Sequence, residues 1–550
     1  MPTVTINTKY FSNLIGSVEI KKAIDQISKL GVEVAGFDDN EIILEITPNR
    51  PDLFCAVGLA RSVKNFMHKS KKFRYAIEKT DPELSITVDN KVNEIRPYIS
   101  AIMVKGMAFS EHALSDVINF TEKICEIHGR GRKRIAIGLH DMNKIRQPLY
   151  YGLYTDEKFV PLNEDKEMRY SEVIKNTEKG VKYGNIIQNG RKGYPALKDQ
   201  EGTLALIPIL NSNRTKVTHK TKDLLVDITG TSKYLTNKIA WLIASVFADL
   251  GCKVYGVNIK NGAVEEVSPM PDDREISVPL SDISHELGVD LSFNSAISLA
   301  NKMGYYGVYL NEEIKVHVPE YRLDIIDWQD ILEDFAIAYG YDYISAVNVP
   351  SSAKGSISEK NTFFSKLSEL MVGLGFTEAL NTYFTDEESN FKKMRTEEID
   401  HVQLLNPKAS TITMMRTSLI PSLLRDLGLS SNEKMPQRFF ELDMVFSIDG
   451  RKPIEEYNLG AVSIDPKSNF NNIKAVVESL AYALDKNIKF KKFDHPSFIE
   501  GRCARIILND EAVGIFGELH PEVLQNFRIE ESGVAFEMSL ARLYSDISQL

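Results

Sequence analysis

The sequence contains few cysteines, and none of them form a recognisable pair. No CxxC motif is present, and the four residues are far apart in the chain: Cys55, Cys125, Cys252 and Cys503. This spacing argues against a disulfide framework and against a cysteine-based zinc site. Unpaired, scattered cysteines are typical of a protein that works in a reducing cytoplasm.

Long hydrophobic segments are also missing. The longest apolar run covers residues 239–248, whereas a membrane-spanning helix needs about 20 apolar residues. The first residues, MPTVTINTKY, contain no basic region followed by an apolar core, so no secretory signal is recognisable. We therefore expect a cytoplasmic protein that makes no contact with a membrane.

The chain has neither a phosphate-binding loop nor an overall excess of positive charge. No GxxxxGK motif occurs, and the net charge is −10. This average hides an asymmetry, because residues 130–222 carry 19 Lys and Arg against 10 Asp and Glu. A basic stretch inside an acidic chain predicts either a local contact with a polyanion or a solvated, lysine-rich surface. Charge alone does not decide between the two.

Strand and helix patterns are mixed along a chain that is too long for one hydrophobic core. Its 550 residues predict three or four domains. Apolar runs predict strands at residues 1–7, 41–47, 134–141, 201–210, 223–231 and 313–318. Helical spacing predicts helices at residues 17–30, 53–66, 114–125 and 238–251. Hairpin strands with a turn at Asp449-Gly450 then indicate an α+β, multidomain protein with an antiparallel sheet in its C-terminal part.

One segment holds an unusual density of like charge. Residues 322–335 read RLDIIDWQDILEDF, with five carboxylates in eleven positions: Asp324, Asp327, Asp330, Glu333 and Asp334. A helix is expected from about Asp327, which places the last three carboxylates on a common side. A hard cation such as Mg²⁺, a solvated acidic face, or an arginine from another domain or subunit would each explain them.

The same segment has a weak echo near the N-terminus. ITPNRPDLF (46–54) and VPEYRLDII (318–326) share the order strand, Pro, Arg, Asp, helix. The similarity is either a reused way of starting a helix or chance.

Longer segments resemble one protein family over nearly the whole chain. VPEYRLDIIDWQDILEDFAIAYGYDYI (318–344) resembles the signature of one domain in the beta subunit of phenylalanyl-tRNA synthetase, archaeal and eukaryotic type. The other matching segments are PNRPDLFCAVGLAR (48–61) for the N-terminal domain, residues 131–141 and 208–231 for the editing domain, and residues 404–424, 438–446 and 516–524 for the synthetase-like domain.

The resemblance implies four parts. An N-terminal α/β domain is expected at residues 1–75, and a mixed α/β, B3/B4-like tRNA editing domain at residues 76–268. A small B5-like domain with a magnesium site follows at residues 269–348. A catalytically inactive, class II synthetase-like domain, built as an antiparallel sheet with helices, is expected at residues 349–550.

The family pattern places Mg²⁺ ligands at a D-x5-D-x2-E-[ED] spacing. All four positions are filled in this chain: Asp324, Asp330, Glu333 and Asp334. Asp327 lies outside the pattern, and we assign it to the helix N-terminus. The resemblance therefore implies that Glu333→Ala abolishes Mg²⁺ binding.

The resemblance also implies a proofreading reaction. A phenylalanine pocket rejects tyrosine by only about 100-fold, so a second, hydrolytic site for Tyr-tRNA(Phe) is useful. Asp227, Thr229 and Asn211 are the candidate catalytic residues, as groups that bind the amine or the tyrosyl hydroxyl or that orient a water. Ser212, Asn213 and His140 are weaker candidates, since the first two also fit a turn and the histidine a structural role. No nucleophilic cysteine or Ser–His pair is apparent, so we expect direct attack by water.

Basic residues beside these motifs are the candidate tRNA contacts, because phosphate contacts need Arg or Lys. They are Arg130, Arg132, Arg134 and Arg214.

The C-terminal domain lacks the working parts of an active class II core. An active motif has Arg two residues before Glu, but Phe439 holds that place before Glu441, and Arg438 is displaced by one. The Gly-rich stretch that ends in an ATP-binding arginine is also absent. The resemblance therefore implies a docking partner, the catalytic alpha subunit, in an α2β2 assembly in which that subunit binds ATP and phenylalanine.

Two other functions remain open from the sequence. A free-standing tRNA-editing hydrolase would need no partner, although it would not need the long C-terminal domain either. A metal-dependent phosphoesterase would use the acidic helix and two close metal ions, but it leaves the rest of the chain unexplained.

Overall fold

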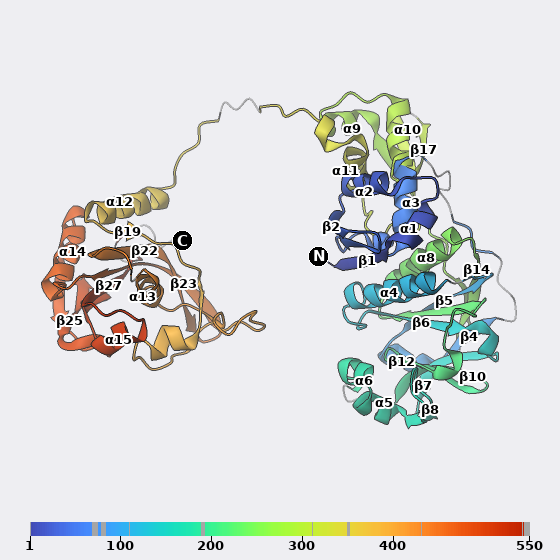
Figure 1. Cartoon of the computed structure of the whole chain (residues 1–550), viewed down its shortest axis with the longest axis horizontal. Helices are drawn as coiled ribbons and strands as arrows, with labels where there is room; N and C mark the ends of the chain where they lie inside the picture. Colours follow the sequence, from blue (N-terminus) through green and yellow to red (C-terminus); the bar gives the residue numbers. More distant parts are fainter. Residues whose placement is uncertain are drawn as a thin grey trace. The chain divides into compact units, whose positions relative to one another are not determined.

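The computed structural model divides the chain into two compact units, residues 1–348 and 349–550 (Figure 1). It describes residues 2–68, 75–78, 84–108, 110–188, 193–310, 312–348, 353–430, 432–541 and 543. Each unit has its own hydrophobic cluster. Helices and strands are mixed in both units, which confirms the predicted α+β, multidomain class.

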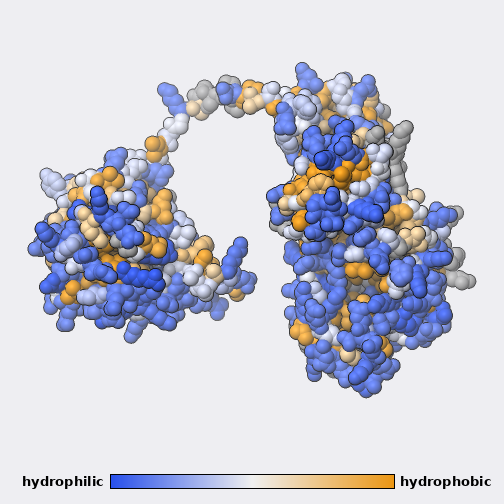
Figure 2. Space-filling view, in the orientation of Figure 1, coloured by the Kyte–Doolittle hydropathy of each residue, from blue (hydrophilic) through white to orange (hydrophobic). Residues whose placement is uncertain are grey.

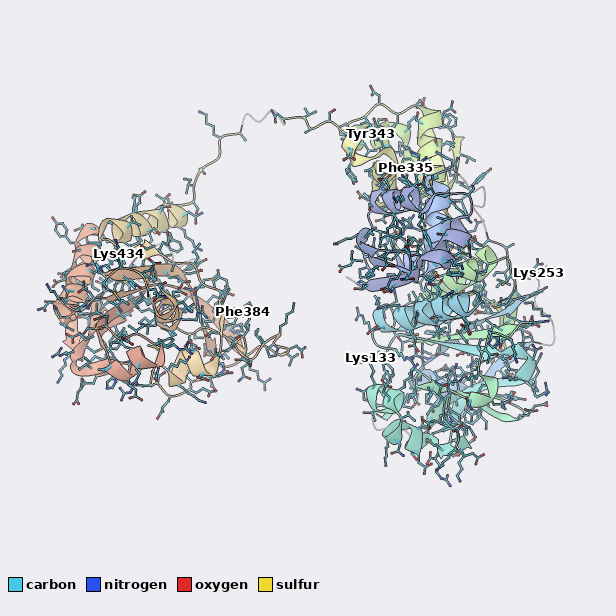
Figure 3. The ribbon with its side chains drawn as sticks, in the orientation of Figure 1. Lys133, Lys253, Phe335, Tyr343, Phe384 and Lys434 are labelled. Carbon is cyan, nitrogen blue, oxygen red and sulfur yellow. The ribbon has the colours of Figure 1, made fainter. Side chains whose placement is uncertain are left out.

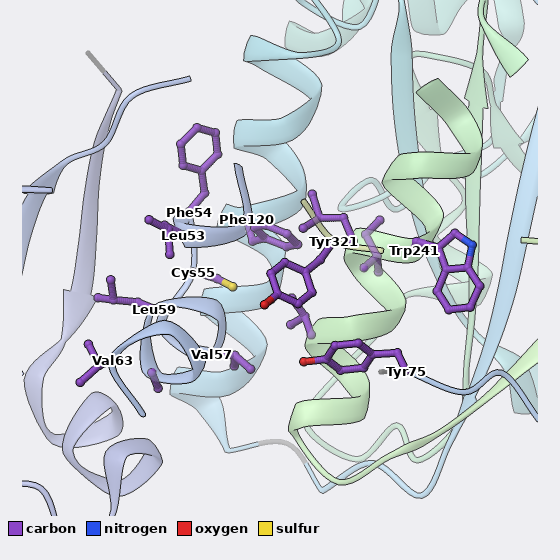
Figure 4. Close-up of a cluster of buried hydrophobic side chains, with 14 of the residues drawn as sticks. Leu53, Phe54, Cys55, Val57, Leu59, Val63, Tyr75, Phe120, Trp241 and Tyr321 are labelled. Atoms are coloured by element: carbon purple, nitrogen blue, oxygen red, sulfur yellow. The ribbon is translucent and has the colours of Figure 1, made fainter. Parts of the chain in front are cut away.

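The first unit begins with a small antiparallel sheet of strand order β1-β3-β2 and three helices. Its elements are β1 (Thr3–Asn7), α1 (Thr8–Ile15), α2 (Ile20–Lys29), β2 (Glu33–Phe37), β3 (Glu41–Glu45) and α3 (Ala56–Phe66). Helix α3 is buried on almost every side. Its Val57, Leu59 and Val63 lie in a cluster that also takes in Phe120 and Trp241 from two later helices (Figure 4). The N-terminal part therefore shares a hydrophobic core with the middle of this unit.

A ten-stranded sheet forms the middle of this unit, in the order β12-β11-β10-β7-β4-β14-β5-β13-β6, with β15 beside β14. The strands are β12 (Leu210–Asn211), β11 (Gly202–Leu206), β10 (Tyr194–Asp199), β7 (Leu149–Tyr154), β4 (Ser85–Val88), β14 (Lys253–Asn261), β5 (Tyr98–Lys105), β13 (Leu224–Gly230), β6 (Ile135–Asp141) and β15 (Val264–Ser268). β4 pairs in parallel with both of its neighbours, and the other pairs are antiparallel.

Two long helices cover one face of the β5-β13-β6 part of the sheet: α4 (Glu111–Ile127) and α8 (Lys233–Asp249). Leu224, Val226 and Ile228 of β13 pack in the same cluster as these helices. Because side chains alternate along a strand, Asp227 and Thr229 face the opposite side. On that side Leu225 of β13 packs with side chains of β4, β7, β10 and β11. The remaining elements of this region are β8 (Lys158–Phe159), β9 (Met168–Arg169), α5 (Tyr170–Asn176), α6 (Glu178–Tyr183) and α7 (Asn185–Gln188). Of these, β8, α5 and α7 pack against β10 and β11.

The strand predicted at residues 201–210 is broken, which corrects that prediction. β11 ends at Leu206, and β12 begins only at Leu210. Pro208 has no N–H for a strand ladder, and the Ile209 N–H turns back to the Leu206 carbonyl at 2.8 Å. The chain therefore folds over itself here and brings Asn211 beside β11.

The last part of the first unit is a three-stranded antiparallel sheet of order β16-β18-β17 with three helices. Its elements are β16 (Arg274–Pro279), α9 (Leu280–Leu287), α10 (Phe293–Lys302), β17 (Tyr306–Leu310), β18 (Glu313–Val318) and α11 (Trp328–Tyr339). Helix α11 starts after Asp327 as predicted, because the Asp327 side chain caps it. Phe335 of α11 is fully buried, whereas Tyr343 beyond it is 76% exposed (Figure 3).

The two echoing segments meet where the N-terminal part packs against this last part. Arg50 and Asp52 form a bidentate pair with two bonds of 2.9 Å, and Arg322 and Asp324 form the same pair at 2.8 and 2.7 Å. All four side chains are at most 10% exposed. The two similar segments therefore share one local structure, a bidentate Arg-x-Asp ion pair just before a helical segment.

The second unit is built on a seven-stranded sheet of order β19-β22-β23-β27-β26-β25-β24. Its strands are β19 (Thr377–Glu378), β22 (Gln437–Asp449), β23 (Lys452–Ile464), β24 (Ile488–Lys492), β25 (Phe498–Leu508), β26 (Glu511–Leu519) and β27 (Gly533–Ser539). Its helices are α12 (Glu359–Gly373), α13 (Ile420–Leu429), α14 (Phe470–Ala483) and α15 (Pro521–Asn526). Only β19 pairs in parallel, and the predicted turn after Asp449 joins β22 to β23.

Candidate functional site

A cavity of about 340 Å³ lies against the face of β6 and β13 that α4 and α8 leave uncovered. The three predicted catalytic residues, Asp227, Thr229 and Asn211, all line it. Its other walls come from α4, from residues 205–210 and from the loop around Leu162. The structure therefore brings together side chains that the sequence separates.

Small residues on β6 make room for the polar side chains of β13. Asp227 pairs in register with Gly138, and Thr229 with Ala136. A Cβ atom at Gly138 would lie 2.0 Å from Asp227 Oδ2. The Asp227 carboxylate can thus occupy this position only because residue 138 has no side chain.

Thr229 is held by an arginine that the sequence did not single out. Arg96 is 1% exposed; its Nε donates to Thr229 Oγ1 at 3.0 Å and its Nη2 to the Thr229 carbonyl at 2.7 Å. Burial lowers the pKa of Arg96 to about 10, so the side chain remains charged at neutral pH. Since Thr229 Oγ1 already accepts a bond from Arg96, its own O–H is left to donate into the cavity.

Among the described side chains, the buried His140 is the one that forms a hydrogen bond with Asp227. His140 Nε2 lies 3.2 Å from Asp227 Oδ2, and its Nδ1 lies 2.8 Å from the Thr215 hydroxyl. Asn211 donates from Nδ2 to the Leu139 carbonyl at 3.2 Å. Ser212 and Asn213 do not line the cavity; the Ser212 hydroxyl accepts a bond from the Arg214 N–H and caps a turn.

A charged cluster borders the same cavity, and two of its members were not predicted. Arg132 Nη2 and Lys179 Nζ each lie 2.6 Å from a carboxylate oxygen of Glu122. Burial acts to raise the pKa of Glu122, but the two cations outweigh it and lower that pKa. Glu122 lies on α4 and Lys179 on α6, far from the recognised motifs, so spacing in the sequence could not reveal them.

The four arginines predicted to contact tRNA differ in how accessible they are. Arg130 and Arg134 are exposed and lie beside the cavity wall. Arg132 is 8% exposed, and besides Glu122 it bonds the Ile209 carbonyl at 2.8 Å. Arg214 pairs with Asp199 at 2.6 Å and with Glu201 at 3.2 Å. Arg132 and Arg214 therefore bond protein carboxylates, and their assignment as tRNA contacts stays a prediction.

The acidic segment is held together by an arginine of its own. Arg322 is 1% exposed and lies between two of the predicted metal ligands, bidentate to Asp324 and 2.7 Å from Asp334. The Tyr305 hydroxyl also donates to Asp334. Burial acts to raise the pKa of Asp324, but the Arg322 guanidinium outweighs it and lowers that pKa.

The remaining carboxylates of this segment have separate structural roles. Asp330 accepts the backbone N–H groups of Ile326 and Asp327 at 2.6 and 3.0 Å, as in a capping box. Glu333 accepts a hydrogen bond from the Tyr341 hydroxyl at 2.8 Å. Within the described ranges no three Asp, Glu, His or Cys side chains converge as a metal would require. The arrangement of these carboxylates does not fit the four-carboxylate magnesium site that the resemblance implies.

The comparisons with known proteins point in one direction. Residues 276–341 match the family described as tRNA synthetase B5 domain, and residues 345–540 match the phenylalanyl tRNA synthetase beta chain CLM domain. The phenylalanine--tRNA ligase beta subunit of Methanocaldococcus jannaschii is 34% identical over 98% of this chain and 100% of that protein. The Archaeoglobus fulgidus subunit is 32% identical over 99% of both chains.

A solved structure agrees with these matches. An N-terminal fragment of the phenylalanyl-tRNA synthetase beta subunit from Pyrococcus horikoshii superposes with a TM-score of 0.59 at 32% identity, covering 62% of this chain and 99% of the fragment. Together the matches define a component of an aminoacyl-tRNA synthetase. The chain belongs to the family of phenylalanine--tRNA ligase beta subunits.

The sequence predicts no membrane-spanning helix. None of the helices described here combines the length and the apolar character that crossing a membrane requires.

Proposed function

We propose that this chain is the proofreading subunit of phenylalanine--tRNA ligase and that its cavity hydrolyses tyrosine wrongly attached to tRNA(Phe). One observation carries the proposal: Asp227 and Thr229 on β13 and Asn211 on β12 line one cavity of about 340 Å³. This volume is typical of a pocket for a small ligand.

The lining of the cavity suits an aromatic amino acid. Apolar side chains such as Ile118, Ile137 and Leu206 offer walls for a ring, while Asp227 and Thr229 mark a polar end. The Asp227 carboxylate is the natural partner of a protonated α-amino group, because the two charges attract in a partly buried site. The tyrosyl hydroxyl would then be read at the opposite end.

Direct attack by water fits this set of residues. The described residues that line the cavity include no Ser or Cys, and its hydroxyls belong to Thr121 and to Thr229, which is bonded to Arg96. In the proposed reaction a water oxygen bonds to the tyrosyl carbonyl carbon and the ester bond to the ribose oxygen breaks. That ribose oxygen takes a proton, which leaves free tyrosine and intact tRNA. Asp227 would orient the amino acid, and the Thr229 O–H would donate to a developing negative charge.

The tRNA contact is proposed for the exposed part of the basic turn before β6. Arg130, Lys133 and Arg134 are exposed (Lys133 is labelled in Figure 3), and the cavity wall at Arg132 lies between them in sequence. The visible face around α5 and α6 is also largely hydrophilic (Figure 2). Cations in this position would hold the tRNA backbone while its 3′ end enters the cavity.

The C-terminal unit is proposed as a class II synthetase-like docking module rather than a second active centre. Its predicted motif glutamate, Glu441, is fully buried and lies 2.6 Å from the buried Arg416. Asn381 also donates to both of its carboxylate oxygens. A carboxylate satisfied in this way is not available to a substrate. We therefore assign ATP, phenylalanine and amino-acid attachment to a separate alpha subunit, in an α2β2 assembly.

The finer division of the chain remains part of this proposal. The separate sheets support an N-terminal domain at 1–75, an editing domain at 76–268, a B5-like domain at 269–348 and a synthetase-like domain at 349–550. Magnesium at Asp324, Asp330, Glu333 and Asp334 remains a prediction of the resemblance alone. The phosphoesterase alternative is dropped, because the two close metal sites it needs do not form among the described carboxylates.

Two measurements test the proposed function. The first is the native mass and subunit content of the tagged chain purified from its own cells, where we expect a heterotetramer with a second, catalytic chain. A lone chain would instead favour the free-standing editing hydrolase. The second is hydrolysis of Tyr-tRNA(Phe) and of Phe-tRNA(Phe) by the purified complex. Failure to release tyrosine faster than phenylalanine would overturn the proofreading assignment.

A further inference from the structure

His140 lies behind the predicted catalytic residues and touches both segments that carry them. It is fully buried on β6, diagonally across from Asp227 on the neighbouring strand. Its two ring nitrogens have different partners, Asp227 Oδ2 at 3.2 Å and Thr215 Oγ1 at 2.8 Å. Thr215 is also fully buried and ends the short turn that comes after Asn211.

The partners determine where the protons lie. An ionised carboxylate only accepts hydrogen bonds, so the proton between His140 and Asp227 must be on Nε2. In the neutral ring Nδ1 then accepts the Thr215 O–H. The chain of donors runs from Thr215 through His140 to Asp227 Oδ2, whereas no residue in the described ranges bonds Oδ1.

Three consecutive residues of β6 therefore serve the site in different ways. Gly138 leaves space for the Asp227 carboxylate, the Leu139 carbonyl holds the Asn211 amide at 3.2 Å, and His140 holds Asp227 and Thr215. We propose that His140 is a positioning residue for hydrolysis, which turns Asp227 toward the cavity and keeps the Asn211 turn in register with it. The inference rests on the proposed function of the cavity.

The contacts of His140 determine the expected kinetic effect. Without it, Asp227 keeps its negative charge and still attracts the amino group of the substrate, so KM should change little. The alignment of the reacting groups is lost, however, and a misplacement of about 1 Å can lower kcat by about 100-fold.

Glutamine and asparagine at this position form a matched pair. His140→Gln places an N–H donor near the position of Nε2, within reach of Asp227. His140→Asn places its amide near the position of Nδ1, too far back to reach the carboxylate. Both variants are similar in polarity, so a general effect of a buried amide should be common to both.

The test uses the complete complex with its alpha subunit. We measure kcat and KM for Tyr-tRNA(Phe) hydrolysis, with aminoacylation and thermal melting as controls. The expected result is a fall in kcat of about 100-fold for His140→Asn at nearly constant KM, and recovery to within about threefold of wild type for His140→Gln. Thr215→Val should lower kcat as well, and Thr215→Ser should not.

Equal losses in the glutamine and asparagine variants, or no loss in either, would overturn the inference while leaving the proofreading function in place. Absence of hydrolysis by the wild-type complex would overturn the proposed function itself, and with it the inference. The two failures are therefore distinguishable.

Discussion

The cavity beside β13 and the acidic helix differ in how closeness in the sequence relates to closeness in the fold. Asn211 lies on β12, and Asp227 and Thr229 lie on β13, yet all three line one cavity. Asp324, Asp330, Glu333 and Asp334 lie within eleven positions, yet they do not share one ligand position: Asp324 and Asp334 bond Arg322, Asp330 bonds backbone N–H groups, and Glu333 bonds the Tyr341 hydroxyl. Proximity in the sequence did not make these carboxylates converge, because the backbone, Arg322 and Tyr341 bond them separately, and the magnesium site stays a prediction of the resemblance.

The two regions differ in whether the protein itself provides a cation that pairs with the carboxylates. At the acidic helix an internal cation compensates Asp324 and Asp334. In the cavity Asp227 bonds the His140 ring, and among the described residues no lysine or arginine forms an ion pair with it. Variants and titrations can test this contrast, from the largest expected effect to the smallest.

Removing the internal cation should cause the largest loss of stability. Arg322→Met leaves Asp324 and Asp334 buried without a counter-charge, which costs about 3–5 kcal/mol. Chemical denaturation of the variant measures this change. Arg322→Lys is the control, because it keeps the charge but not the fork, and it should lose less. Wild-type stability in Arg322→Met would mean that the arginine is not what holds the helix.

Removing the free carboxylate of the cavity should abolish proofreading without unfolding the chain. Asp227→Ala is expected to slow Tyr-tRNA(Phe) hydrolysis by about 1000-fold, since the charge that orients the substrate is lost. Amino-acid activation by the complex should stay unchanged, and Asp227→Asn separates charge from shape. Equal losses in hydrolysis and activation would contradict the assignment.

Filling the space on β6 should displace Asp227 without removing it. In Gly138→Ala the new Cβ would lie 2.0 Å from Asp227 Oδ2, so the carboxylate must move. We expect hydrolysis to fall by about 100-fold. The matched control is Gly36→Ala on β2, where a Cβ would make an ordinary contact of 3.6 Å with Ile43. A similar activity in both variants would show that the position of Asp227 is not critical.

A half-buried carboxylate that forms no ion pair among the described residues should respond to pH in the opposite sense to Asp324. Asp116 on α4 accepts the Ala56 N–H at 3.0 Å, and burial raises its pKa to about 6. Because the folded pKa lies above the unfolded value, this group stabilises the fold below about pH 4, and the contribution is lost as pH rises through about 6. The change is about 2 kcal/mol.

The lowered pKa of Asp324 works the other way, since its contribution is present above the unfolded value and lost in acid. Denaturation midpoints of wild type and Asp116→Asn at pH 5 and about pH 8 test the Asp116 prediction. The variant should gain stability relative to wild type at the higher pH. A constant difference across this range would rule out Asp116 as the titrating group.

The smallest effect is expected from magnesium. If Arg322 neutralises the segment, calorimetric titration with Mg²⁺ should give little heat, and Glu333→Ala should not change it. The family resemblance predicts the opposite, namely clear binding that Glu333→Ala abolishes. A strong, Glu333-dependent heat would restore the four-carboxylate site.

Much of the secondary structure was accessible from the sequence. The strand at residues 313–318 and the hairpin at Asp449 follow from alternation and turn chemistry, and both are confirmed. The strand at 201–210 was predicted as continuous because a run of apolar residues does not show where the hydrogen bonds between strands stop. Arg322 could have been recognised, since it is the first residue of the acidic segment, but its neighbours suggested a metal instead.

The sequence by itself determined the family, the α+β class and the identity of Asp227, Thr229 and Asn211 as candidates, because motifs and hydrophobic periodicity are local properties of the chain. Only the tertiary structure decided which charges are compensated and which remain free. Glu122 and Lys179 line the cavity, whereas Arg96 and His140 hold Thr229 and Asp227 from behind it, and the partners of all four depend on strand register and helix packing. Burial and hydrogen bonding depend on such long-range neighbours, and no spacing within one segment encodes them.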